Sequence, residues 1–202
     1  GANYKALTRD PAHPLFDRAL MTSYPPGSTF KPTQGLILLQ EGIITTGTAY
    51  PCHHGYISGR LRVGCHSHAS PLALKPALQT SCNAFFCYGF KAMIDRRSKY
   101  GNSANAFEVW KKHLVSMGYG YRLGIDLPGE SRGFIPNDRF YNKIYGKGHW
   151  SANTIISVSI GQGEIGATPV QIANLCATIA NRGWFITPHV VKAVSDTVMD
   201  KE

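Results

Sequence analysis

The sequence lacks any long apolar run. No stretch of its 202 residues approaches the roughly 18 apolar residues of a membrane span, and no signal peptide opens it. Acidic residues are few, 12 against 21 Lys and Arg, which gives a formal charge of +9. The basic residues are dispersed, without an arginine-rich arm, so we expect no nucleic-acid partner, whereas attraction to an anionic polymer or membrane surface stays open.

The stretch YPPGSTFKP, residues 24–32, organises the rest of the chain. Its prolines and glycine interrupt regular structure, and Ser28 then opens an apolar segment that predicts a helix to about Gly42. Ser28 can simply cap that helix. Lys31, however, lies on the same face, and a lysine whose charged form is disfavoured can serve as base to a serine nucleophile. Both interpretations are open on these residues alone.

A second short motif, Ser81-Cys82-Asn83, connects two predicted helices, 72–80 and 84–99. By itself the motif is explained by capping, since Ser81 can close one helix and Asn83 can open the next. Together with Ser28 and Lys31, the same hydroxyl and carboxamide are candidate site groups.

The remaining pattern is mostly helical. We predict a long loop or small hairpin insert at about 43–70, a helix over 104–117 and a strand or packed turn at 155–160. Residues 134–153 show no clear period. A nearly all-apolar helix over 168–183 should be central and buried, and residues 184–194 are strand-like. The sequence therefore predicts an α/β (α+β) protein, a mainly helical lobe with part of a sheet.

Several motifs, in order and spacing, resemble one family. Residues 24–31, 81–86, 123–130, 160–163 and 167–171 closely resemble the penicillin-binding transpeptidases of the penicillin-binding protein 2 type. The resemblance implies the penicillin-binding fold with an incomplete antiparallel sheet. It also implies peptidoglycan D,D-transpeptidase activity in cell-wall elongation at the periplasmic face of the inner membrane. Stem peptides, β-lactams and other cell-elongation proteins are the implied partners.

The resemblance implies a role for each motif residue. Ser28 would attack a D-alanyl-D-alanine peptide or a β-lactam and form an acyl-enzyme, with its backbone N–H in the oxyanion hole. Lys31 would take the serine proton, Ser81 would pass protons between Lys31 and the leaving amine, and Asn83 would bind the substrate amide. No cofactor is implied for this catalysis.

The sequence departs from the family in its third motif. No Lys-Thr/Ser-Gly follows residue 183. We therefore expect residues 1–202 to be a partial transpeptidase domain that lacks the third-motif strand, the pedestal and the membrane anchor, and to be inactive or weakly active in isolation. A penicillin-binding sensor that is acylated without cross-linking is the alternative. A β-lactamase is disfavoured, since no deacylating carboxylate is evident near Ser28.

Cysteine and histidine gather between the first two motifs. The candidate ligands of a closed tetrahedral structural zinc site are Cys52, Cys65, His68 and Cys82. Some relatives of the penicillin-binding protein 2 type are similar in carrying a metal at this place. His53, His54 and His66 are also within reach, a Cys52–Cys65 disulfide is an alternative, and so are histidines that merely decorate a loop. Cys87 and Cys176 are predicted to be buried thiols.

Overall fold

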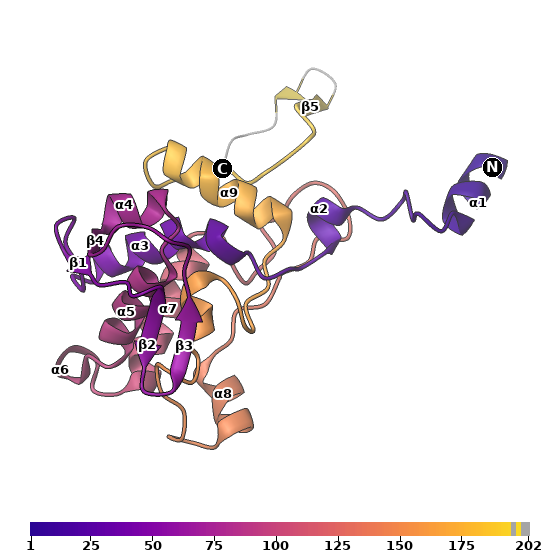
Figure 1. The fold of residues 1–202 in the computed structure, drawn as a ribbon. Coiled ribbons are helices and arrows are strands. Elements are labelled where there is room, and N and C mark those ends of the chain that lie inside the picture. Colours follow the sequence, from indigo (N-terminus) through magenta and orange to yellow (C-terminus); the bar gives the residue numbers. More distant parts are fainter. Residues whose placement is uncertain (195–196, 199–202) are drawn as a thin grey trace. The chain divides into compact units, whose positions relative to one another are not determined.

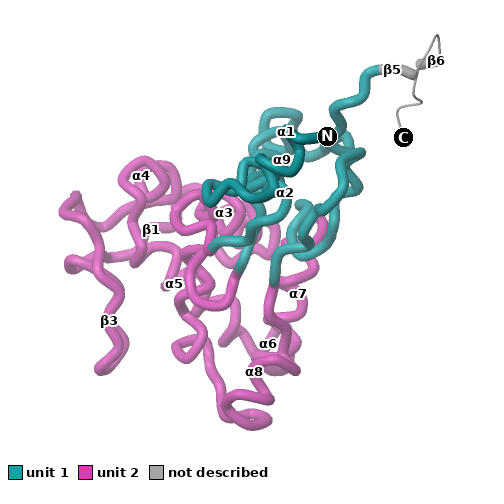
Figure 2. The backbone as a smooth tube through the Cα atoms, turned by 90° about the vertical axis from the view of Figure 1, so that its right-hand side faces the viewer, with its two compact units in different colours: residues 1–24, 117–134, 166–202 teal, residues 25–116, 135–165 magenta. Residues whose placement is uncertain are grey.

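A computed structural model of the chain describes residues 1–194 and 197–198. The chain divides into two compact units, coloured separately in Figure 2. One comprises residues 1–24, 117–134 and 166–202, and the other comprises residues 25–116 and 135–165. Helices dominate, and among the described residues every sheet is a two-stranded pair (Figure 1). The expected fold, a helical lobe with an incomplete antiparallel sheet, is confirmed in this respect. No helix in this described part combines the length and apolarity of a membrane span.

The larger unit, residues 25–116 and 135–165, contains all the candidate site residues. Its helices are η1 (Gly27–Phe30), α3 (Lys31–Gln40), α4 (Leu74–Gln79), α5 (Asn83–Ile94), α6 (Arg97–Tyr100), α7 (Ser103–Ser116), α8 (Asp138–Tyr145) and η2 (Ile156–Ile160). Its strands are β1 (Ala49–Tyr50), β2 (Gly55–Ser58), β3 (Leu61–Gly64) and β4 (Leu72–Ala73).

The segment predicted as a loop or small hairpin is a hairpin. Strands β2 and β3 pair antiparallel from Gly55 opposite Gly64 to Ser58 opposite Leu61. Strands β1 and β4 pair where the insert leaves and rejoins the helices. The hairpin is fastened to the body of the unit, because the buried Tyr56 donates a hydrogen bond to Asn153 Oδ1 at 2.6 Å.

Helix α5 occupies the core of the larger unit. Phe85, Phe86 and Phe90 on this helix have no exposed surface, and neither does Trp110 on α7. The buried Trp110 indole N–H has a hydrogen-bond partner, because it donates to Gln34 Oε1 on α3 at 2.7 Å. Truncation of a buried aromatic of this size costs about 3–5 kcal/mol, so these contacts fix how α3 and α5 pack.

Several helix boundaries differ from the sequence prediction. The helix predicted to run from 84 to 99 ends at Ile94, and the separate α6 follows. Residues 155–160 form the packed turn η2 and not a strand. Helix α8 lies in residues 134–153, where no period was visible in the sequence. The helix is only eight residues long, and Tyr141 is its one buried residue. The helix at 104–117 is confirmed within one residue at each end.

The smaller unit, residues 1–24, 117–134 and 166–202, contains α1 (Ala2–Arg9), α2 (Arg18–Met21), α9 (Pro169–Ala180), β5 (Ala193–Val194) and β6 (Thr197–Val198). Thr168 caps α9 in a capping box with Gln171, as Thr-Pro predicted. The Glu130 carboxylate accepts hydrogen bonds from the backbone N–H groups of Leu123 and Gly124, at 2.6 and 3.0 Å. These bonds close the loop formed by residues 123–130.

The prediction that α9 is buried on nearly all sides is wrong. Its buried side is largely polar, since Gln171 and Thr178 are inside while Ile179 is 43% exposed. Gln171 is drawn inward because its amide donates to the carbonyls of Tyr121 and Arg132. Cys176 is consequently exposed, contrary to prediction, whereas the thiol of Cys87 is buried as predicted. Of the strand-like residues 184–194, only Ala193 and Val194 form a strand.

Candidate functional site

The turn that carries Ser28 is fixed by its neighbours. Gly27 adopts a left-handed φ of +58°, and its N–H donates to Gly161 O at 2.8 Å. Gly161 also requires glycine: its φ is +70°, and a Cβ there would lie 2.4 Å from Gly27 O. The Ser28 side chain is exposed on η1 and does not act as a side-chain cap of either η1 or α3. The capping interpretation of Ser28 is therefore wrong.

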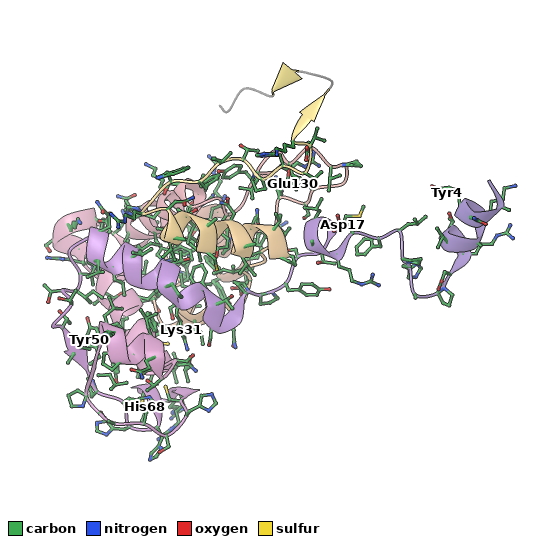
Figure 3. The ribbon with its side chains drawn as sticks, turned by 90° about the horizontal axis from the view of Figure 1, so that it is seen from above. Tyr4, Asp17, Lys31, Tyr50, His68 and Glu130 are labelled. Atoms are coloured by element: carbon green, nitrogen blue, oxygen red, sulfur yellow. The ribbon has the colours of Figure 1, made fainter. Side chains whose placement is uncertain are left out.

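Lys31, the first residue of α3, is 2% exposed (labelled in Figure 3). Its Nζ donates to three oxygens: Ser81 O at 2.6 Å, Ser81 Oγ at 2.8 Å and Asn83 Oδ1 at 2.6 Å. Burial lowers the pKa of the Lys31 ammonium, against an opposing effect of the thiols of Cys65, Cys82 and Cys87. A buried lysine with a lowered pKa is a suitable proton acceptor.

Ser81 is held in a conformation that L-residues seldom adopt, with φ of +54°. The backbone around it is fixed by two hydrogen bonds, Ser81 N to Leu78 O and Cys82 N to Ala77 O. In this conformation the carbonyl and the hydroxyl of Ser81 both reach Lys31 Nζ. A strained backbone of this kind costs about 1–3 kcal/mol and is common at functional sites.

The three side chains form a hydrogen-bonded line. Ser81 Oγ donates to Ser28 Oγ at 3.0 Å, and Lys31 Nζ donates to Ser81 Oγ. The sequence predicted direct reach between Lys31 and Ser28 along one helix face. In the structure their hydrogen-bonded connection runs through Ser81, because Lys31 Nζ donates to oxygens of Ser81 and Asn83 and the Ser81 hydroxyl in turn donates to Ser28.

Both ends of the Asn83 carboxamide are engaged. Its Oδ1 accepts from Lys31, and its Nδ2 donates to Gly64 O at the end of β3, at 2.7 Å. Asn83 is not the cap of α5. That position belongs to Cys82, whose sulfur accepts from Phe85 N at 3.4 Å.

Two positions that support the site were not singled out as such in the sequence. Gly64 orients Asn83 through its carbonyl, and Gly161 holds the Ser28 turn through Gly27. A backbone carbonyl leaves no signature in residue type, so Gly64 could not have been found. Gly161 lies in one of the stretches that carry the family resemblance, which was the available signal.

The four predicted metal ligands lie together. The sulfurs of Cys52, Cys65 and Cys82 and a ring nitrogen of His68 are all within 4.8 Å of one another. The Cys65 and Cys82 sulfurs are 3.9 Å apart, and all three thiols are free. Zn–S bonds of about 2.3 Å in a tetrahedron require sulfurs about 3.8 Å apart, so this donor set fits zinc. The alternative fourth ligands His53, His54 and His66 lie outside the group.

His68 contributes to this cluster a ring nitrogen that makes no hydrogen bond with the described residues. Its Nδ1 is 2.7 Å from Ala69 O, and as the N–H tautomer it donates there. Its Nε2 is buried and has no hydrogen-bond partner among the described residues. A ligating histidine commonly donates its other ring N–H to a carbonyl in this way, so the orphaned Nε2 is oriented as a metal ligand would be.

Cys65 links the cluster to the site. Its sulfur accepts from the backbone N–H groups of Asn83 at 3.0 Å and Ala84 at 3.3 Å, at the start of α5. Burial by itself would raise the pKa of the Cys65 thiol, but the Ala84 N–H, His68, Cys52 and the Asn83 N–H outweigh it and lower that pKa. The Cys65 sulfur, as an acceptor of these two hydrogen bonds, thus fixes the backbone of Asn83.

Comparison with known proteins identifies the family of the chain. A family model of the penicillin binding protein transpeptidase domain matches residues 2–202. The chain belongs to this transpeptidase family. Peptidoglycan D,D-transpeptidase MrdA of Acinetobacter baumannii is 33% identical over 197 residues, which cover 95% of this chain and 27% of that relative. The transpeptidase chain therefore spans between a quarter and a third of the length of the MrdA relatives.

Solved structures agree on the fold of this transpeptidase chain. A structure of a peptidoglycan synthase complex that coordinates polymerization and crosslinking contains a chain of 28% identity. It superposes with a TM-score of 0.82 over 100% of this chain and 33% of that one. The PBP2 of Helicobacter pylori, in complex with MreC, is 26% identical with a TM-score of 0.75. The match covers 93% of this chain and 33% of that one.

Proposed function

We propose that this chain supplies the nucleophile and the proton relay of a peptidoglycan D,D-transpeptidase of the elongation type. The observation that carries the proposal is the hydrogen-bonded line from Lys31 through Ser81 to Ser28. The line runs from a buried amine of lowered pKa to an exposed hydroxyl, which is the arrangement that a serine nucleophile needs. β-Lactams would acylate the same Ser28 and so inhibit the enzyme.

In the reactive form Lys31 is neutral. Its two N–H bonds go to Ser81 O and Asn83 Oδ1, and its lone pair then accepts from Ser81 Oγ, which in turn accepts from Ser28. Ser28 Oγ attacks the carbonyl carbon of the penultimate D-alanine, while its proton passes to Ser81 and the Ser81 proton passes to Lys31. General-base assistance of this kind contributes about 10²–10⁴-fold in rate.

The acyl-enzyme then forms and is resolved with the same relay. The C–N bond to the terminal D-alanine breaks, and the leaving nitrogen takes a proton from Lys31 through Ser81. The amine of a neighbouring stem peptide attacks the Ser28 ester, gives up its proton to the relay, and releases Ser28 as the hydroxyl. The Ser28 backbone N–H contributes to the oxyanion hole, where removal of one donor typically costs about 3–4 kcal/mol of barrier.

Asn83 binds the substrate amide through the second Nδ2 hydrogen, because the first is given to Gly64 O. Its Oδ1 remains committed to Lys31. Substrate binding and base orientation thus share one carboxamide, and Asn83 cannot rotate without disturbing both.

Cys52, Cys65, His68 and Cys82 hold a structural zinc ion in this proposal. The support is the closeness of the four donor atoms, which lie within 4.8 Å of one another, and the buried Nε2 of His68, which has no hydrogen-bond partner among the described residues. When bound, zinc supplies no step of the reaction and staples the insert beside the second motif. We expect one zinc per chain in protein purified without chelators, much less in Cys65→Ser or His68→Ala, and no change in His66→Ala, which lies outside the cluster. Metal-free wild-type protein or a disulfide under non-reducing conditions would exclude the site.

The cellular setting follows from the relatives and is proposed on that basis. The chain would work at the periplasmic face of the bacterial inner membrane on peptidoglycan stem peptides. Its whole protein would be attached there by a membrane anchor and would operate with other cell-elongation proteins. The Helicobacter pylori relative was solved with MreC, which is a protein of the kind we expect as partner.

Acylation by a fluorescent penicillin tests the nucleophile. We expect covalent labelling of the chain, loss of labelling in Ser28→Ala, and unchanged labelling in Ser98→Ala, an exposed serine on α6. Because the variants are compared within one chain, a low absolute rate does not obscure the result. Equal labelling of Ser28→Ala and wild type would refute the proposal.

Transfer of the acyl group distinguishes an enzyme from the alternative, a penicillin-binding sensor. A transpeptidase passes a D-alanine thioester acyl group from Ser28 to an added D-amino acid, and the product is detected by mass spectrometry. A sensor retains the acyl group. Stable acylation of Ser28 without transfer in the full-length protein would favour the sensor and contradict the transpeptidase assignment.

A further inference from the structure

The chain from residue 42 to residue 94 contains no acidic residue. A uniform distribution of 12 acidic residues over 202 positions would place about three in these 53. The acidic residues at either side are already engaged, Glu41 with Lys99 and His113, and Asp95 with Lys91. The residues of this segment that carry a permanent charge are therefore all basic.

Two arginines of this segment lie on the β2–β3 hairpin. Arg60 follows the turn at Gly59, and Arg62 lies on β3. Both side chains are exposed, and no ion pair of either is present among the described residues. An exposed guanidinium without an internal partner is free to pair with a carboxylate of a ligand, and its planar donors suit that group.

The exposed face of β3 leads to the site. Along this strand Leu61 and Val63 are half-buried, whereas Arg62 and Gly64 are exposed, so the latter two share the outer face. Gly64 O binds Asn83 Nδ2, and a Cβ at Gly64 would meet no atom within 4 Å. Two strand residues span about 7 Å, which is therefore the separation along β3 between Arg62 and Gly64, the residue whose carbonyl binds the Asn83 amide.

The hairpin is a rigid support for these arginines. Tyr56 Oη donates to Asn153 Oδ1, and Asn153 Nδ2 donates to Ser58 Oγ at 2.8 Å, next to the turn that carries Arg60. The Tyr56 ring also packs edge-on against Tyr88 of α5 at 4.7 Å. Groups held in place before a ligand arrives lose less entropy on binding, which makes exposed arginines more effective.

We propose that Arg60 and Arg62 form a carboxylate-binding subsite for the peptide that reaches Ser28. The inference rests on the proposed function, which makes the ligand a stem peptide, and assigns the binding of that peptide's free carboxylates to these two arginines. In this arrangement Asn83 holds the amide next to the reacting carbonyl, while Arg62 and then Arg60 bind free side-chain carboxylates farther along the same peptide. The subsite adds affinity and direction and takes no part in proton transfer.

The test measures binding without reaction. The background is the chain with Ser28→Ala, and the probe is a fluorescent pentapeptide that ends in D-alanyl-D-alanine and has two free side-chain carboxylates. A second probe has both carboxylates amidated. The variant is R60Q/R62Q, and the matched control is K111Q/K112Q, which removes the same charge from α7. Thermal unfolding of all proteins verifies that the exposed substitutions leave the fold intact.

We expect R60Q/R62Q to weaken binding of the acidic peptide about fivefold, since a loss of about 1 kcal/mol from two exposed ion pairs together corresponds to that factor, and K111Q/K112Q to weaken it less than about twofold. The amidated peptide should bind all three proteins equally. Equal weakening in both double variants would overturn the subsite, since it would show general attraction to charge. So would arginine-dependent binding to phosphatidylglycerol vesicles without any arginine effect on the peptide. Penicillin labelling of Ser28 is read separately, so failure of the subsite and failure of the proposed function are distinguishable.

Discussion

The substitution Gly161→Ala tests whether the turn behind Ser28 controls its reactivity. A Cβ at this position would lie 2.4 Å from Gly27 O and 2.6 Å from Phe30 Cβ. The oxygen belongs to the backbone next to the nucleophile, so the conflict cannot be relieved by a side-chain rotation. Gly27 and with it Ser28 must move, and the hydrogen bond from Gly27 N to Gly161 O is stretched.

The expected loss of folding stability in Gly161→Ala is the sum of two contributions. A non-glycine residue in the left-handed region costs about 1–2 kcal/mol. Displacing the Gly27 turn adds about 1–3 kcal/mol, as overpacking of a close contact does. Gly163→Ala is the matched control, because Gly163 has a similar φ of +72° but its Cβ would only approach the Ser157 side chain, at 3.3 Å. The two variants therefore share the first contribution and differ in the second.

Thermal unfolding and penicillin acylation are both measured for Gly161→Ala and Gly163→Ala. At about 2–4 °C per kcal/mol for a chain of this size, Gly161→Ala should unfold roughly 2–12 °C below Gly163→Ala. Penicillin acylation should fall about 100-fold in Gly161→Ala, since a displacement near 1 Å at the reacting group can have that effect, but only a few-fold in Gly163→Ala. If both variants lose the same stability and the same rate, the contact with Gly27 does not position Ser28.

Three further predictions concern other groups. Lys31→Met should retain the α3 helix by circular dichroism but lose about 10²–10⁴-fold in acylation rate, and an unchanged rate would remove Lys31 as base. Glu41, whose pKa is lowered to about 2 because hydrogen bonds from Lys99, Tyr100 and His113 outweigh burial, should stabilise the fold by at most about 3 kcal/mol above pH 4.5. Chemical denaturation of Glu41→Gln should show this difference at pH 7 and its loss as pH falls from about 4.5 toward 2, and a pH-independent difference would contradict it. Chelation of the proposed zinc should accelerate amide hydrogen exchange at the start of α5, where Cys65 accepts from backbone N–H groups, and unchanged exchange would separate the cluster from the site.

The sequence predicted the residues of the site better than their connection. Spacing placed Ser28 and Lys31 at the start of a helix, and this was confirmed apart from the 3₁₀ turn. The resemblance implied that Ser81 passes protons to and from Lys31, but spacing alone could not predict that Ser81 also connects Lys31 to Ser28, because this depends on a left-handed φ at a serine, for which the sequence gives no requirement. The Cys65-x-x-His68 spacing, with two more cysteines, grouped four residues whose ligand atoms the structure places together, while their role as zinc ligands stays a prediction.

Prediction of the fold failed where local pattern and tertiary contacts disagree. The apolar residues of α9 indicated burial, yet Gln171 is inside because two backbone carbonyls need its amide. Helix α8 was not predicted because its eight residues are too few for an apolar period to be recognised, although Tyr141 and Tyr145 lie four residues apart on one face. The helix expected to continue to residue 99 stops at Ile94, where Asp95 and Arg96 begin a turn whose Arg96 side chain bonds Gly42 O.

Strand β3 brings the separate features of the site into one short segment. Its outer face presents Arg62, its last carbonyl at Gly64 binds the Asn83 amide, and the next residue, Cys65, contacts the start of α5 and joins the thiol cluster. A two-stranded hairpin is marginally stable by itself in water, so we propose that this geometry depends on the Tyr56 contacts and on the thiol and imidazole cluster at its base. That dependence gives the cluster a physical reason to lie next to the second motif: by fixing Cys65 it fixes Gly64, and through Gly64 it holds the Asn83 carboxamide toward Lys31.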